Sequence, residues 1–140
     1  MKKEVFMDYI NRFNNRDATT FEDYIDPDCV IINGTLELRG IQGMKGHYAR
    51  IWRSTREELH VERFVSDDDT IAIQMWTHFA VEKDDDDSPF GKVKAGECFD
   101  YHGIIMYELK NSKYTSIKVS YLSFTYTDVK GNKKELGIPH

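Results

Sequence analysis

The sequence has little cysteine and no long apolar run. Its two cysteines, Cys29 and Cys98, are too few and too far apart for a cysteine-rich zinc site or a disulfide framework. No apolar run approaches the ~20 residues that a membrane-spanning helix needs. The N-terminal residues MKKEVFMDY do not have the pattern of a signal peptide. These features predict a cytoplasmic protein that does not interact with a membrane.

Positive charge is also scarce. The net charge is −5, and the lysines and arginines are scattered rather than gathered into a basic stripe. A nucleic-acid partner is therefore not expected, because phosphate binding requires a basic face. The composition, 40% hydrophobic and 31% charged, is typical of a globular domain. We expect a single domain over residues 1–128 and a polar C-terminal tail over 129–140.

Three segments in the first third of the chain have helical spacing. Residues 3–16 carry apolar side chains at intervals of three and four, and a shorter helix is expected over 21–25 after a capping aspartate and threonines. Asp26-Pro27-Asp28 ends it, and the β-branched run 29–33 predicts a short strand. Residues 40–55 have the pattern of a third amphipathic helix.

From residue 58 onward the apolar residues alternate. The alternation predicts strands over 59–66 and 70–83, a loop over 84–91, and a long hairpin over 96–126 that turns at 110–113. Helices followed by an antiparallel sheet of four to six strands make an α+β protein.

Three stretches in this order resemble the SnoaL-like (polyketide cyclase-like) family of the NTF2-like superfamily. They are YINRFNNRD at 9–17, HVERFVSDDDTIAIQMWT at 60–77 and YELKNSKY at 107–114, where Ser112 and Tyr114 replace a glycine and an isoleucine usual in the family. The resemblance covers nearly the whole chain. It implies an NTF2-like cone, in which three N-terminal helices pack on a strongly curved, mostly antiparallel sheet that encloses a pocket, and a homodimer.

The catalytic groups of related enzymes are incomplete in this sequence. Tyr9 matches the tyrosine that ketosteroid isomerases use as a hydrogen-bond donor. Their basic aspartate corresponds to Asn33, which cannot take up a proton near neutral pH, and their second acid corresponds to Ile105.

The epoxide hydrolases and polyketide cyclases of this fold show the same loss. The Arg and Asp that the hydrolases carry two residues apart correspond to Met75 and Thr77, and their Tyr-x-Asn keeps only Asn33. Val119 stands where both the hydrolases and the polyketide cyclases have an aspartate on the last strand. Each family mechanism therefore lacks an essential group.

Strand parity decides which side chains face the pocket, because neighbouring residues on a strand point to opposite faces. The odd-numbered residues of 70–82 are the more apolar set, so we expect odd positions to face inward, although one bulge would reverse the order. The predicted function is binding of a small apolar or aromatic metabolite without a cofactor. The predicted ligand-binding residues are Tyr9, Asn33, Met75, Thr77, Tyr101, Tyr107 and Tyr121.

Two other hypotheses remain open. If even positions face inward, Asp100 and His102, aided by His78 or His47, would form the acid–base group of a cyclase, isomerase or dehydratase. Alternatively, side chains fill the cone and the protein is only a dimerisation module. No HxH or HxxxH spacing supports a metal site, and none is predicted.

Overall fold

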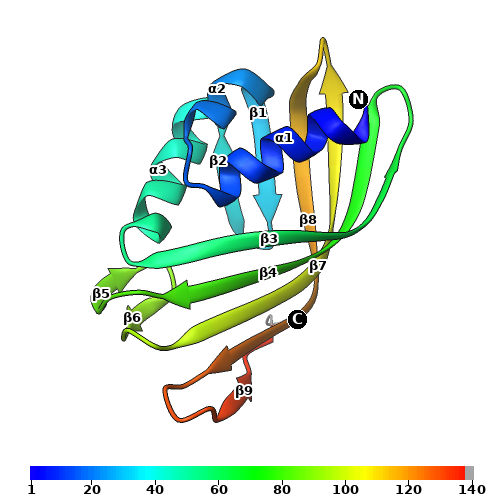
Figure 1. Ribbon diagram of the computed structural model, residues 1–140. Coiled ribbons are helices and arrows are strands. Elements are labelled where there is room, and N and C mark those ends of the chain that lie inside the picture. Colours follow the sequence, from blue (N-terminus) through cyan, green and yellow to red (C-terminus); the bar gives the residue numbers. More distant parts are fainter. Residues whose placement is uncertain (138–140) are drawn as a thin grey trace.

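The computed structural model describes residues 1–137 and shows three helices against one side of a bent sheet (Figure 1). The helices are α1 (Lys3–Asn14), α2 (Thr19–Tyr24) and α3 (Gly40–Trp52). The strands are β1 (Ile25–Asn33), β2 (Leu36–Arg39), β3 (Thr55–Ser66), β4 (Thr70–Val81), β5 (Asp85–Ser88), β6 (Gly91–Val93), β7 (Cys98–Lys110), β8 (Lys113–Thr127) and β9 (Lys133–Glu135). The α+β class predicted from the sequence is confirmed.

The main sheet is mixed and mostly antiparallel. Its strand order is β2-β1-β8-β7-β4-β3, with β9 added to β8; β1 and β8 run parallel, and the other neighbours are antiparallel. β5 and β6 form a separate small hairpin. In Figure 1, β1 and β8 rise steeply from β3 and β4, so the sheet bends around the side that carries the helices.

The long strands alternate between buried and more exposed residues. On β4 and β7 the odd-numbered residues from Ile71 to Val81 and from Phe99 to Tyr107 are buried, as the apolar pattern predicts. On β8 the order changes, because the register with β7 shifts between His102 and Gly103. Beyond this bulge Tyr101 pairs with Phe124, so an even-numbered residue of β8 takes the inward place.

The apolar stripe of α1 packs onto the sheet. Phe6, Tyr9, Ile10 and Phe13 are buried, and the ring of Phe6 meets that of Tyr107 edge-on at 5.2 Å. Asn14 at the end of α1 bonds the edge of β3: its amide nitrogen donates to the Leu59 carbonyl at 3.0 Å, and its oxygen accepts from the Leu59 N–H at 2.8 Å. These two bonds replace a strand partner at the β3 edge.

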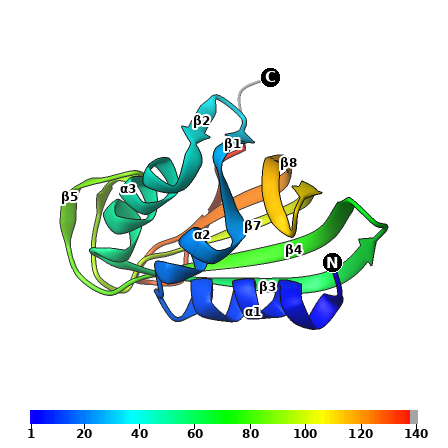
Figure 2. The ribbon, with the colours of Figure 1, turned by 90° about the horizontal axis from the view of Figure 1, so that it is seen from above.

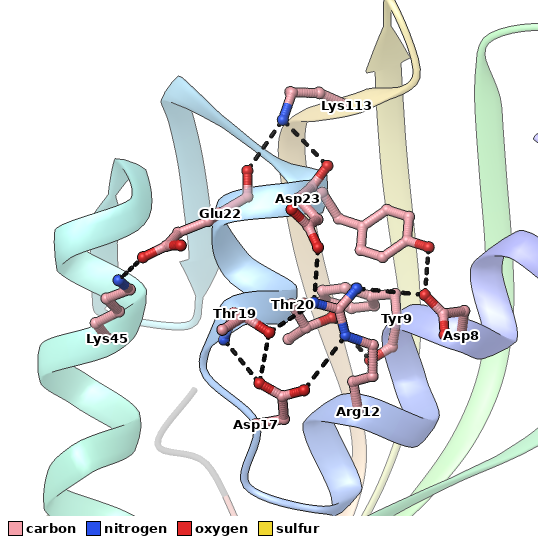
Figure 3. Close-up of polar contacts among 11 residues, drawn as sticks. Asp8, Tyr9, Arg12, Asp17, Thr19, Thr20, Glu22, Asp23, Lys45 and Lys113 are labelled. Atoms are coloured by element: carbon pink, nitrogen blue, oxygen red, sulfur yellow. Dashed lines mark hydrogen bonds and ion pairs between the residues drawn. The ribbon is translucent and has the colours of Figure 1, made fainter.

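Arg12 joins α1 to α2 through several carboxylates and a hydroxyl. Its Nη2 donates to Thr19 Oγ1 and Asp23 Oδ2, both at 2.7 Å, while Asp8 and Asp17 lie at 3.4 and 3.5 Å (Figure 3). The burial of Thr20, whose hydroxyl donates to the Tyr9 carbonyl at 3.2 Å, completes the contact. This polar network fixes α2 beside α1.

Two lysines connect the same region to more distant elements. Lys113, at the start of β8, donates to the carbonyls of Glu22 and Asp23 at 3.0 and 3.1 Å, and Lys45 of α3 pairs with the Glu22 carboxylate (Figure 3). Since these contacts join α2 to both α3 and the sheet, they position α3 over one end of the sheet.

The structure corrects several predicted boundaries. The third helix ends at Trp52 rather than Thr55, and β3 begins at Thr55 rather than at residue 59. The predicted loop 84–91 contains β5 and the start of β6, and β2 was not predicted. β9 lies within the predicted polar tail, of which residues 138–140 lie outside the described part.

Within residues 1–137, no helix combines the length and the apolar character needed to cross a membrane.

Candidate functional site

A cavity of about 250 Å³ lies between α3 and the inward face of the sheet. Its lining is mostly aliphatic and aromatic, and it includes residues from α3, six strands of the main sheet and the β5–β6 turn. The lining residues are Ile31, Asn33, Leu36, Leu38, His47, Tyr48, Ile51, Glu57, Leu59, Met75, Thr77, Phe79, Pro89, Phe90, Tyr101, Ile105, Val119 and Phe124.

The β5–β6 hairpin forms one wall of the cavity. Figure 2 shows it beside α3 at the same end of the molecule, and Arg53 joins the two, with its Nε and Nη2 donating to the Asp85 carboxylate at 3.1 and 2.9 Å. Phe90, at the turn, stacks on Phe99 of β7 with ring centroids 4.6 Å apart. These contacts keep the turn closed against the sheet.

Six of the positions that the resemblance assigns to catalytic groups line this cavity, and here they are uncharged. Ile31, Asn33, Met75, Thr77, Ile105 and Val119 all contribute to the lining. Tyr101 donates from its hydroxyl to Asn33 Oδ1 at 3.2 Å, and Thr77 donates to Met75 Sδ at 3.4 Å. Most of the cavity wall is therefore apolar, and its hydroxyl and amide groups are those of Asn33, Tyr48, Thr77 and Tyr101.

Glu57 is the one lining residue with a carboxyl group among the described residues, and it is not among the residues predicted from the sequence. Its side chain lies on β3, is only 5% exposed and lines the cavity. Among the described residues, no group hydrogen-bonds to its buried Oε1. Burial raises the pKa of this carboxyl to about 8.

The burial pattern and pairing of β3 explain why Glu57 points inward. Thr55, Glu57 and Leu59 alternate with exposed or half-buried residues, and Glu57 pairs with Phe79 of β4, another inward residue. The predicted strand begins at residue 59 and therefore does not include Glu57. The three consecutive residues 56–58 are all charged, so no apolar alternation in the sequence marks Glu57 as an inward residue.

His47 also lines the cavity, from α3. Burial, together with the nearby charge of Arg50, lowers the pKa of its imidazole, so this side chain is neutral at pH 7. Of the four residues predicted for acid–base chemistry, only His47 reaches the cavity.

The other three lie on the opposite face of the sheet. Trp76 Nε1 donates to Asp100 Oδ1 at 2.8 Å, and His78 Nδ1 lies 2.7 Å from the same oxygen. His102 stacks parallel to the Trp76 indole, with ring centroids 6.1 Å apart. An Asp100–His102 pair in the pocket would require these even-numbered side chains to point inward. They point outward, because the odd-numbered residues of β7 occupy the inward face.

The predicted ligand-binding residues divide into three sets. Asn33, Met75, Thr77 and Tyr101 line the cavity. Tyr9 and Tyr107 line a neighbouring cavity of about 50 Å³ deeper in the core. Tyr121 lines neither and donates to Glu135 Oε1 at 2.9 Å, while Phe124 takes the inward place beyond the bulge.

In residues 1–137, no cluster of three or more histidine, cysteine, aspartate or glutamate side chains is arranged to hold a metal ion.

The family model described as a SnoaL-like domain matches residues 6–117 of the chain. The protein is a member of the SnoaL-like family. No curated protein matches the sequence. The match to the family model confirms the SnoaL-like resemblance noted from the sequence.

Solved structures show the same fold at low sequence identity. A SnoaL-like polyketide cyclase from Agrobacterium tumefaciens is 14% identical, with a TM-score of 0.64 over 85% of this chain and 91% of its own. A protein from Catenulispora acidiphila with a ketosteroid isomerase-like fold, in complex with trimethylamine, is 10% identical, with a TM-score of 0.67 and coverages of 86% and 87%. A computationally designed 17-OHP binder is 13% identical, with a TM-score of 0.69 and coverages of 87% and 95%. At these identities the likeness of this SnoaL-like protein to the three extends to the fold.

Proposed function

We propose that this protein binds a small, mainly apolar or aromatic metabolite in the cavity between α3 and the sheet. The observation that carries the proposal is the cavity itself, about 250 Å³ in volume and lined mainly by aliphatic and aromatic side chains with a few polar groups. Binding sites for small molecules have this composition. The volume is below the usual range for drug-sized ligands, which favours a ligand with a single ring.

The structural relatives support binding as the shared use of the fold. One was solved with trimethylamine, and another was designed to bind 17-OHP. The hypothesis of a dimerisation module with a filled cone fits less well, because the side chains leave this cavity open. The cyclase, isomerase or dehydratase hypothesis fits less well because Asp100 and His102 do not line the cavity.

Filling the cavity tests the proposal. Isobutylbenzene is a suitable probe, and its binding can be followed by changes in the amide NMR spectrum of the protein. Val119→Trp places a large ring at the cavity wall, and we expect it to abolish binding. Lys118→Trp is the matched control, because Lys118 is exposed on the same strand and the variant should bind normally.

Two results would contradict the proposal. One is absence of binding to the unmodified protein at any accessible probe concentration. The other is binding that Val119→Trp leaves intact while the variant keeps a native spectrum.

We also propose that the protein is a homodimer through the outer face of β4 and β7. Two apolar residues of β7 are exposed there, Ile104 (37%) and Met106 (47%), and His60 stacks on Trp76 with ring centroids 4.7 Å apart. A face with such apolar and aromatic side chains is typical of an interface. Light scattering should give twice the monomer mass, and Met106→Lys should give the monomer mass. A monomer for the unmodified protein at high concentration would exclude the dimer.

A further inference from the structure

Glu57 is unusual because its carboxyl group is buried beside open space. Its side chain is 95% shielded from solvent, and among the described residues no donor reaches Oε1. Leaving a buried polar atom unpaired is unfavourable, and it is more unfavourable for a charged group. Most buried carboxyls avoid this cost through an internal partner. Glu57 is also one of the residues that line the cavity, so a ligand there lies next to this side chain.

No internal cation can serve as the partner. Of the cavity-lining residues, none is a lysine or an arginine, and His47 is kept neutral by burial. The nearby arginines of α3 and its C-terminal end are bound at the surface: Arg50 Nη2 donates to the Asp87 carbonyl at 3.4 Å, and Arg53 pairs with Asp85. Among the described residues that line the cavity, Glu57 is the only one with a carboxyl group, and no cationic side chain accompanies it.

Aromatic rings surround the same space. Tyr48 of α3, Phe90 of the β5–β6 turn and Phe79, the β4 neighbour of Glu57, all line the cavity. The faces of aromatic rings attract cations, and a carboxylate among rings is a recurrent way to recognise an ammonium group.

We propose that Glu57 is the specificity-determining residue of this cavity and that the ligand is a small apolar or aromatic compound carrying one basic nitrogen. The protonated nitrogen donates to the carboxylate of Glu57, and its alkyl groups contact the rings of Tyr48, Phe79 and Phe90. This inference rests on the proposed function, because it identifies the chemical class of the ligand bound in the same cavity.

The other titratable groups near Glu57 do not change charge between pH 7 and 9. Burial raises the pKa values of Tyr9, Tyr48 and Tyr101 above the ordinary tyrosine value, and it lowers the pKa of His47. A pH dependence of ligand binding in this range would therefore report on Glu57.

A matched pair of probes tests the inference. N,N-dimethylbenzylamine is a cation at pH 8, and isobutylbenzene has the same shape with carbon in place of nitrogen. We expect the unmodified protein to bind the amine about tenfold more tightly at pH 8, as measured by titration calorimetry or NMR. This preference should fall about fivefold between pH 8 and pH 7, because Glu57 retains its own proton in more of the molecules at the lower pH.

Two variants test whether Glu57 causes the preference for the amine. Glu57→Gln should bind both probes equally at every pH, while Glu58→Gln, changed at the neighbouring position on the outer face, should keep the preference for the amine. An unmodified protein that binds the two probes equally, or a Glu57→Gln variant that still prefers the amine, overturns the inference.

The outcomes separate this inference from the proposed function. Binding of isobutylbenzene without a preference for the amine contradicts the role of Glu57 and leaves the apolar cavity site intact. Absence of binding of either probe contradicts both. A third probe, isobutyrophenone, tests whether Glu57 acts instead as a neutral hydrogen-bond donor. If this ketone binds most tightly, and more tightly at pH 7 than at pH 9, the protonated carboxyl donates to the carbonyl and the amine is excluded as the ligand class.

Discussion

Glu57 and Glu58 are neighbours on β3 with the same kind of side chain, and the two faces of the sheet give them opposite properties. Glu57 points inward, where burial raises its pKa to about 8. Glu58 points outward, where a hydrogen bond from Arg56 Nε at 2.8 Å is the main cause of a lowered pKa. On the outer face Glu58 has an arginine partner, whereas on the inner face no group of the described residues hydrogen-bonds to Oε1 of Glu57.

The same contrast separates Glu57 from Asp100. Asp100 accepts from the Trp76 indole and lies beside His78 on the outer face, so its carboxylate already has protein partners. A carboxylate that is already satisfied contributes to the structure of that face. A carboxyl group that lines a cavity and has no protein partner for one of its oxygens is the better candidate for binding a ligand.

The largest expected effect comes from Glu57→Gln. The folded-state pKa of Glu57 is raised from 4.5 to about 8, so the unfolded chain loses this proton first as the pH rises. The contribution of the protonated carboxyl group to the free energy of unfolding is fully present below pH 4.5. It is lost progressively as the pH rises to about 8. The glutamine stays neutral at every pH. At pH 9 the free energy of unfolding of the variant should therefore exceed that of the unmodified protein by about 2–4 kcal/mol, and at pH 4.5 the two values should be similar.

Urea denaturation at a series of pH values checks this prediction. Glu58→Gln is the control: it removes an ion pair whose carboxylate is 40% exposed, so it should lower stability by no more than about 0.5 kcal/mol above pH 5. Parallel pH profiles for Glu57→Gln and the unmodified protein would show that Glu57 is not desolvated.

A smaller effect is expected from Asp100→Ala on the outer face. The change removes the acceptor of the Trp76 indole and the neighbour of His78, both only partly exposed, and should lower the free energy of unfolding by about 1 kcal/mol. Binding of isobutylbenzene in the cavity should not change. A variant of native stability that no longer binds the probe would place Asp100 in the functional site and reverse the assignment of the two faces.

The smallest effect is expected from Tyr101→Phe. This change removes the hydrogen bond to Asn33 Oδ1 at the cavity wall, which is partly buried, and should lower the free energy of unfolding by about 0.5–1 kcal/mol. Thermal unfolding checks the value. A rise in stability would mean that burying the Tyr101 hydroxyl destabilises the protein by more than its hydrogen bond to Asn33 stabilises it.

The sequence by itself determined the helices, the long strands and most of the inward side of the sheet. Helical spacing and period-two alternation are local properties, so they predict α1, β4 and β7 without knowledge of distant contacts. The same alternation places Met75, Thr77 and Tyr101 on the inward face, and the quoted stretches identify the SnoaL-like family.

Only the tertiary structure decided which of these residues meet at one cavity. The bulge opposite Gly103 exchanges Tyr121 for Phe124, and it depends on how β7 and β8 pair, which no local pattern specifies. Glu57 becomes a buried, unpaired carboxyl because β4, α3 and the β5–β6 turn close around it. The pKa and hydrogen-bond partners of a side chain are set by groups distant in sequence, so the chemistry of the site appears only once the chain is folded.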